Sequence, residues 1–276
     1  MLIRHLIAAL TVVVFAPQTM RAQKGDASPL GPGQYFERFG GFLSAGGIRQ
    51  SGSFTVDCPC QSFTGGGGSE FSVGAVYERV PASSYIWGVT AGYRYRTMDA
   101  RYVLREDTTL RSLDGQSLFP NVQIPFRHSS TISVSSITVM PYVKRFIAKS
   151  LFARVGLAAG VVVGSTKDFR KTLLTNTVTL PNDDVIRIEM DRAALEARGL
   201  RFSGDNEVVL EEGPMNDVSA FNLAVVPAVG FQWQVGKRMF LVPMFEYSLP
   251  VTGVSSTDTS LRMHALRAVV EVHVDF

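Results

Sequence analysis

The sequence has little charge, very little cysteine and no long apolar run. Charged residues make up 18% of its 276 positions and the formal net charge is +3, whereas an average soluble domain has about 25% charged residues. Two cysteines exclude a disulfide scaffold, and the nearly neutral chain lacks the basic surface on which nucleic-acid binding depends. No apolar run reaches the roughly 18 residues of a membrane-spanning helix, which excludes a helical membrane protein.

The first 22 residues predict a secretory signal peptide. Arg4 precedes an apolar core at residues 6–16, Pro17 ends that core, and Ala22 offers a small residue for cleavage. The alternative is a membrane anchor, but a helix of this length is too short for about 30 Å of hydrocarbon. We therefore expect export and removal of residues 1–22.

Alternation of apolar and polar residues dominates the rest of the chain. From Leu266 to Phe276 the even positions are apolar and the odd positions are polar, with one exception. A period of two predicts a β-strand that has one apolar and one polar face. Seven further segments show the same pattern, at about residues 36–49, 71–78, 85–96, 137–144, 151–163, 221–235 and 241–249.

The connections between these segments alternate in length. Short turns are expected at residues 79–84, 145–150 and 236–237. Long loops are expected at residues 50–69, 98–130, 164–218 and 250–260. Short turns at one end and long loops at the other are typical of an outer-membrane barrel, in which closure pairs every backbone donor and acceptor.

The two faces of the strands indicate which solvent the barrel meets. The polar face is rich in Gly and Ala, as the narrow interior of an eight-strand barrel requires. The other face carries Trp87, Trp233 and Tyr247 near strand ends, like the aromatic girdles at lipid interfaces. We predict an all-β fold, an eight-stranded antiparallel transmembrane β-barrel with long extracellular loops. A secreted soluble β domain is the alternative.

Two features leave details of the strands open. Pro141 and Pro227 lie on the apolar face, where a residue without an N–H interrupts the ladder, and we interpret them as β-bulges. Ten strands are possible if a hairpin within residues 164–218 extends the wall.

Together the leader, the alternating strands, the turn-and-loop rhythm and the closing segment VVEVHVDF resemble the small outer-membrane barrels of the OmpA/OmpX type. Cys58-Pro59-Cys60 and the glycine run at residues 65–68 are similar to an uncharacterised branch of that superfamily. The resemblance implies a Gram-negative outer membrane, a periplasmic segment at residues 23–35 and a barrel domain at residues 36–276. It also implies that Phe276 is the aromatic end that the barrel-assembly machinery recognises.

Charged residues on the polar face form a candidate lumen network. They are Arg94, Arg154, Glu246, Arg267 and Glu271. One interpretation is a gate for small solutes. We favour a plug of paired charges, because an unpaired buried charge costs several kcal/mol and the interior of eight strands is narrow.

Residues 164–218 form the longest expected loop, and we expect partner contacts there. Residues 172–190 predict a hairpin around residues 181–184, and Asp191 can cap a short helix that ends at Gly199. Acidic residues without an intervening base follow: Asp205, Glu207, Glu211, Glu212 and Asp217. They could bind a cation or a basic partner, or form a solvated acidic surface, which is the favoured interpretation.

Other reactive residues give weak signals. Cys58 and Cys60 predict a loop disulfide, since no further metal ligands lie nearby in the sequence. His264 lies close in sequence to Ser255, Ser256 and Ser260, but no nucleophile motif accompanies them. We therefore expect no catalytic, metal or cofactor site.

The sequence predicts a monomeric outer-membrane protein with a structural or adhesive role through its external loops. Its expected partners are outer-membrane lipid, the assembly machinery and an extracellular ligand or protein at residues 164–218, with no nucleic acid. A narrow pore or small-molecule binder is the second hypothesis, and a lipid-modifying enzyme is the third.

Overall fold

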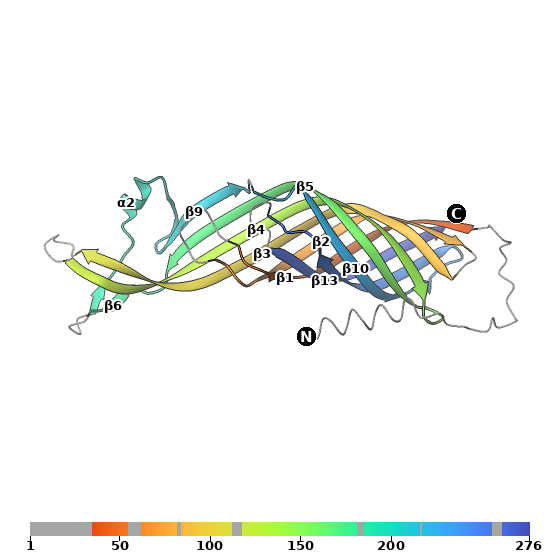
Figure 1. Ribbon diagram of the computed structural model, residues 1–276, viewed down its shortest axis with the longest axis horizontal. Coiled ribbons are helices and arrows are strands. Elements are labelled where there is room, and N and C mark those ends of the chain that lie inside the picture. Colours follow the sequence, from red (N-terminus) through yellow and green to blue (C-terminus); the bar gives the residue numbers. More distant parts are fainter. Residues whose placement is uncertain are drawn as a thin grey trace.

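Eight long strands close into an antiparallel barrel in the computed structural model (Figure 1). They are β1 (Tyr35–Ser51), β2 (Gly66–Pro81), β3 (Tyr85–Arg111), β4 (Leu118–Phe146), β5 (Leu151–Leu173), β10 (Phe221–Phe231), β12 (Met239–Pro250) and β13 (Arg262–Asp275). β1 pairs with β13 and β5 pairs with β10, which closes the ring. The structure describes residues 35–54, 62–81, 84–111, 118–180, 185–215, 217–255 and 261–276. The predicted eight-stranded barrel is confirmed.

The outer wall of the ring is apolar over its middle and aromatic at its ends. Leu43, Ile137 and Leu266 point outward and are 55%, 55% and 58% exposed. Trp87 near the short-turn end and Tyr95 near the opposite end mark the two borders of this belt. Such a continuous apolar surface is stable in contact with lipid tails and not with water. The barrel therefore spans a membrane, as the sequence predicts.

The interior is filled because glycines on one strand face large side chains on its neighbours. A Cβ added to Gly88 would lie 2.7 Å from the ring of Tyr142, and one added to Gly92 would lie 3.0 Å from the ring of Phe42. Glycine at these positions lets each ring cross the lumen. The predicted role of the small residues, packing a narrow interior, agrees with this arrangement.

Pro141 and Pro227 do not form β-bulges, which corrects the interpretation from the sequence. Pro141 pairs with Val89, and Pro227 pairs with Val155, with no register shift on either side. Each proline instead leaves a short gap in the ladder on its other side, against β5 and β12 respectively, because it has no N–H to donate. The register shift within the barrel wall lies at Ser135.

Three strands continue far beyond the apolar belt as a projection at the end opposite the short turns (Figure 1), which is the extracellular side in an outer-membrane barrel. β3 runs to Arg111, β4 begins at Leu118 and β5 runs to Leu173, so most of the expected loop at residues 98–130 is strand. Val122, Ile124 and Phe126 are buried, and Asn121, Gln123 and Arg127 among the residues between and beside them are exposed, which is the same period-two signal in a more polar segment.

The segment at residues 164–218 packs on this projection. β9 (Glu207–Pro214) and β8 (Arg201–Gly204) extend the sheet from β5, while β6 (Thr177–Thr179) and β7 (Val185–Arg187) form the predicted hairpin. The predicted helix is present as α2 (Arg192–Glu196), capped by Asp191. No helix among the described residues is long and apolar enough to span a membrane. A ten-stranded wall is wrong, because β10 and not β9 pairs with the membrane half of β5.

Candidate functional site

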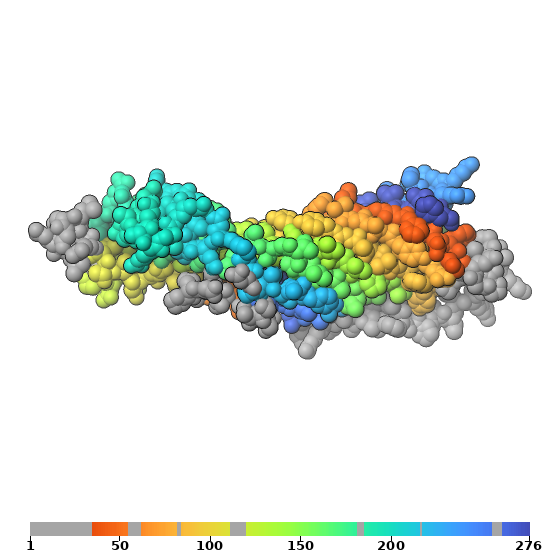
Figure 2. All heavy atoms as spheres, turned by 90° about the horizontal axis from the view of Figure 1, so that it is seen from above, coloured from red at the N-terminus to blue at the C-terminus, as the bar shows by residue number. Residues whose placement is uncertain are grey.

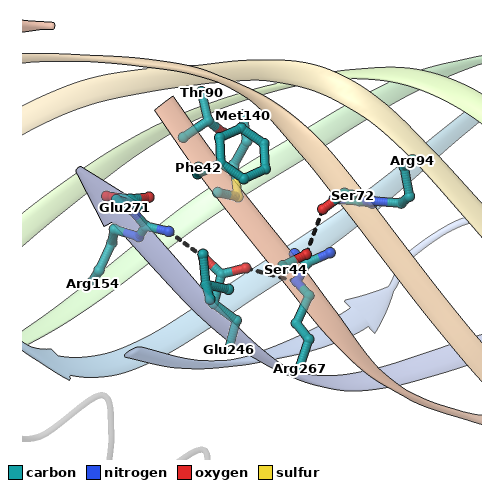
Figure 3. A pocket seen from close by; sticks show the side chains of 11 residues that line it. Phe42, Ser44, Ser72, Thr90, Arg94, Met140, Arg154, Glu246, Arg267 and Glu271 are labelled. Atoms are coloured by element: carbon teal, nitrogen blue, oxygen red, sulfur yellow. Dashed lines mark hydrogen bonds and ion pairs between the residues drawn. The ribbon is translucent and has the colours of Figure 1, made fainter. Parts of the chain in front are cut away.

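All five predicted lumen charges come together in the interior of the barrel (Figure 3). Arg154 of β5 donates to Glu271 of β13 at 2.7 Å and also to Glu246 of β12. Arg267 of β13 donates to Glu246 at 2.7 Å. Arg94 of β3 is buried beside this group, and inward-facing positions of four strands therefore build one network.

The structure adds several members that the sequence interpretation did not include. Glu70 of β2 bridges the network, since Arg267 donates to it and the Nε of Arg94 lies 3.4 Å from its carboxylate. Arg96 donates to the other oxygen of Glu70 at 2.5 Å. Glu70 lies on the same alternating face as the five predicted charges, so extending the period-two pattern of β2 by one residue would have found it.

A second group of charges lies nearer the periplasmic end. Glu78 of β2 accepts from Lys144 at 2.5 Å and from Tyr142 at 2.9 Å. His273 lies 3.3 Å from Glu78 and 2.8 Å from Glu271, which joins this group to the network around Arg154. All of these side chains are buried, so their charges are balanced by each other and not by water.

Glu78, Glu271 and His273 together carry the donor types of a metal site. Each carboxylate, however, already has a cationic partner, Lys144 for Glu78 and Arg154 for Glu271. A bound dication would have to displace these two bases. We therefore assign the trio to the charge network.

The lumen has no room for solute among the described residues. The cavity lined by Phe42, Arg94, Arg154 and Glu246 has a volume of about 20 Å³, enough for about one water molecule. Above it, apolar side chains fill the extracellular mouth, where the rings of Phe54 and Phe63 stack at 4.9 Å. In the part of the barrel that the structure describes, ion pairs thus fill the middle of the lumen and an apolar cluster closes its extracellular mouth.

The acids of the predicted patch at residues 205–217 have partners in the structure. Glu207 pairs with Arg170 of β5 at 2.9 Å, and Glu211 pairs with Lys167 at 2.5 Å. Glu212 pairs with Arg201, Asp205 lies 3.6 Å from Arg192, and Asp217 accepts from Ser255. Glu207 and Glu211 meet bases of β5 because β9 lies antiparallel to that strand, so residues distant in sequence are adjacent in the sheet.

The remaining sequence candidates are separated or lie outside the described residues. Cys58, Cys60, Ser256 and Ser260 are outside them, as is the leader. Ser255 donates to Asp217, and His264 instead contacts Ser51 of β1 at 2.9 Å. Phe276 follows β13 directly, and its ring packs edge-on against Phe39 at 5.5 Å.

The projection carries its own core and a polar hollow. Inward side chains of β4 and β5 pack against the β6–β7 hairpin, and Figure 2 shows the turquoise segment of β6 to β9 covering the yellow β3–β4 hairpin. A hollow of about 750 Å³ lies at the base of the projection. It is lined by Gly65, Gly66, Gly67, Asp99, Ala100, Arg101, Arg127, Ser129, Ser130, Thr131, Thr172 and Glu207. Arg101, Arg127 and Asp99 form no ion pair among the described residues, so these three side chains give the hollow an excess of one positive charge.

A buried histidine links the strands of the projection. His128 of β4 is 1% exposed and stacks between the rings of Tyr102 and Phe169. Its Nε2 lies 3.1 Å from Glu106 of β3, whose other oxygen accepts from Lys171 of β5 at 2.5 Å. Burial lowers the pKa of His128 below its ordinary value, although the hydrogen bond with Glu106 opposes this change.

Acidification is expected to loosen the projection. The folded state favours neutral His128, so this contribution to stability is complete above pH about 6.5 and is lost as the pH falls below that value. Hydrogen exchange of the outer amides of β3 and β4, corrected for intrinsic rates, should accelerate at pH 5 relative to pH 7.5. The His128→Phe variant should lose most of that difference, and an unchanged difference would contradict the assignment to His128.

Among known proteins, the chain is similar only in fold to the solved structures described below. No family model and no curated protein matches the sequence. Among solved structures, the chain is similar to Neisserial surface protein A, with 13% identity, a TM-score of 0.35, and coverage of 86% of this chain and 97% of that one. It is also similar to OprG of Pseudomonas aeruginosa, with 11% identity, a TM-score of 0.34, and coverage of 88% and 95%.

The attachment invasion locus protein Ail of Yersinia pestis, in complex with a heparin analogue, has 10% identity and a TM-score of 0.29 over 87% of this chain and 99% of that one. The fold assignment itself rests on the closed ring and its apolar belt. The closed ring and its apolar belt make the protein an integral membrane β-barrel, and the solved outer-membrane proteins are similar to it in fold alone.

Proposed function

We propose that this protein acts through its external projection, as an interaction or adhesion protein of the cell surface, and that the barrel is a sealed anchor. The observation that carries the proposal is the division of the molecule into two parts. The described lumen is filled, whereas β3, β4 and β5 continue outward and pack a second core of their own.

The projection has the properties of a binding surface. Its strands are continuous with the barrel wall, so the surface is held rigidly and loses little conformational entropy when a partner binds. Arg101 and Arg127 face the polar hollow together with Ser129, while the one acid there without an ion pair among the described residues, Asp99, accepts from Thr131. The two guanidinium groups suit a partner with carboxylate, phosphate or sulfate groups. The partner class we propose is an extracellular acidic polymer or protein.

Attachment of cells tests this proposal. Cells that display the protein should attach to a cultured epithelial layer better than cells that lack it. The Arg101→Ala/Arg127→Ala variant should lose most of that gain, roughly tenfold if both cations contact the partner. The control is Lys149→Ala/Lys237→Ala, which removes two exposed cations from the periplasmic turns. Equal attachment by all strains, at equal surface amounts, would refute the proposal.

A narrow pore is the second hypothesis. Its support is the charged lumen. The charged side chains that the structure describes there form ion pairs with each other, however, and the cavity among them holds about one water molecule. A lipid-modifying enzyme is the third hypothesis. Ser51 and His264 have the contact of a nucleophile and base, but among the described residues His264 meets Tyr247 and no carboxylate.

Assembly and organisation complete the proposal. We infer that residues 1–22 direct export, that residues 23–35 lie in the periplasm and that the barrel is a monomer. Phe276 follows β13 at the short-turn end of the barrel, where its backbone N–H donates to the carbonyl of Glu37. An exposed aromatic side chain at this end supports a role for Phe276 in recognition by the barrel-assembly machinery.

A further inference from the structure

Two arginines face outward side by side at the extracellular rim of the barrel. In the β1–β13 ladder, Arg49 is opposite His264 and Ser51 is opposite Arg262. Both arginines are exposed on the side of the wall that faces lipid lower down. The Ser51 hydroxyl lies 2.9 Å from His264 Nε2, and Tyr247 lies 3.3 Å from His264 Nδ1, so polar side chains surround the pair.

The height of this group matches the headgroup layer of the outer leaflet. Leu266 belongs to the apolar belt, and Arg262 lies four residues further out on the same face of β13. With about 3.3 Å per residue and a strand tilt of about 40°, the guanidinium is about 10 Å above that leucine. The polar layer begins just outside the hydrocarbon, which is about 30 Å thick in all.

The arginines at the opposite rim of the barrel have aromatic partners. Arg79 lies over the Tyr35 ring at 3.4 Å, and Arg145 lies over the Tyr85 ring at 5.2 Å and donates to its hydroxyl. Arg49 and Arg262 have neither an aromatic ring nor a carboxylate as partner among the described residues. Two adjacent cations without an anion repel each other, and an anion between them would relieve that repulsion.

We propose that Arg49 and Arg262 bind a phosphate group of an outer-leaflet lipid. A guanidinium donates to two phosphate oxygens at once, and the two arginines together can contact one phosphate group from both sides. The position on the lipid-facing side, directly above the apolar belt, selects a membrane lipid over a soluble phosphate, because the acyl chains can lie along Leu266 and the wall below it. Arg49 is opposite Gly67, which borders the hollow of the projection, but neither Arg49 nor Arg262 lines that hollow.

Binding of lipopolysaccharide, whose lipid carries phosphates, tests the inference. The purified barrel in phosphatidylcholine nanodiscs should bind rough lipopolysaccharide at least about tenfold more tightly than the Arg49→Gln/Arg262→Gln variant does. The control is Arg79→Gln/Arg145→Gln, which removes two rim arginines that already have ring partners and should leave the affinity unchanged. Unaltered heat-modifiability on gels would show that each variant is folded.

Two further arms identify the source of the phosphate. Enzymatically dephosphorylated lipopolysaccharide should bind wild type as weakly as native lipopolysaccharide binds the double variant. Inorganic phosphate at millimolar concentration should not compete. Equal affinity of wild type and the double variant would overturn the site, and full competition by inorganic phosphate would overturn the assignment to a lipid. Neither result depends on cell attachment, which tests the projection separately.

Discussion

Replacement of Arg154 by alanine is expected to destabilise the barrel by about 3–5 kcal/mol. Arg154 donates to both Glu246 and Glu271, and all three side chains are buried. Its removal leaves two carboxylates with too few partners in the lumen, and the penalty for uncompensated buried charge is of that size. Urea unfolding of the protein in lipid vesicles measures the loss.

The control for this prediction is Arg145→Ala, which removes an arginine from the outer wall at the periplasmic rim. That residue contacts only Tyr85 among the described residues, so the expected loss is below about 1 kcal/mol. Adding Glu271→Gln to Arg154→Ala should recover part of the stability, because it removes one of the stranded charges. Equal losses in Arg154→Ala and Arg145→Ala would contradict a charge-paired plug.

The same variant also separates a plug from a pore. Wild type in planar bilayers should give no steady single-channel current, since the described charge pairs leave a cavity of about 20 Å³. A pore gated by these charges would instead conduct in wild type and conduct less after Arg154→Ala. The sealed-anchor hypothesis fails if steady wild-type currents are observed.

The faces of the barrel were predictable from the sequence because a β-strand has a period of two that no other element shares. The positions of Arg94, Arg154, Glu246, Arg267 and Glu271 on the inner face follow from that period alone. The pairing of these residues does not. Arg267 meets Glu70 from a strand that lies almost 200 positions earlier, and only the register around the closed ring brings them together.

The extent of the strands was harder to predict, because the solvent changes along them. Inside the membrane the outward residue must be apolar, as Ile137 is, and the alternation is strong. Beyond the membrane, water tolerates the outward Arg101 and Arg127, and the interior accepts the polar His128. The alternation between apolar and polar residues is therefore weak there, although the strands continue. The partners of the acidic segment at residues 205–217 were equally hidden from the sequence pattern, since Lys167 and Arg170, which pair with Glu211 and Glu207, lie on β5.

The apolar belt gives the second large prediction, Leu43→Arg. Leu43 points outward from β1, is opposite Val270 and Val73 on the neighbouring strands, and lies near the middle of the belt. An arginine at the centre of a bilayer costs about 2–4 kcal/mol in a barrel wall. Folding into vesicles of a lipid with a defined thickness, followed by guanidinium titration, measures that cost.

Val103→Arg provides the matched control, because exposure is nearly equal and only the surroundings differ. Val103 is 57% exposed and Leu43 is 55% exposed, and both point outward from long strands of the same sheet. Val103 lies on the projection opposite Arg127, where water and not lipid meets the wall, so its replacement should change stability by less than about 0.5 kcal/mol. The difference between the two variants measures the solvent on each side of the rim. If both were tolerated equally, water would surround the whole wall, and the belt from Leu43 to Leu266 would have to be buried against protein instead.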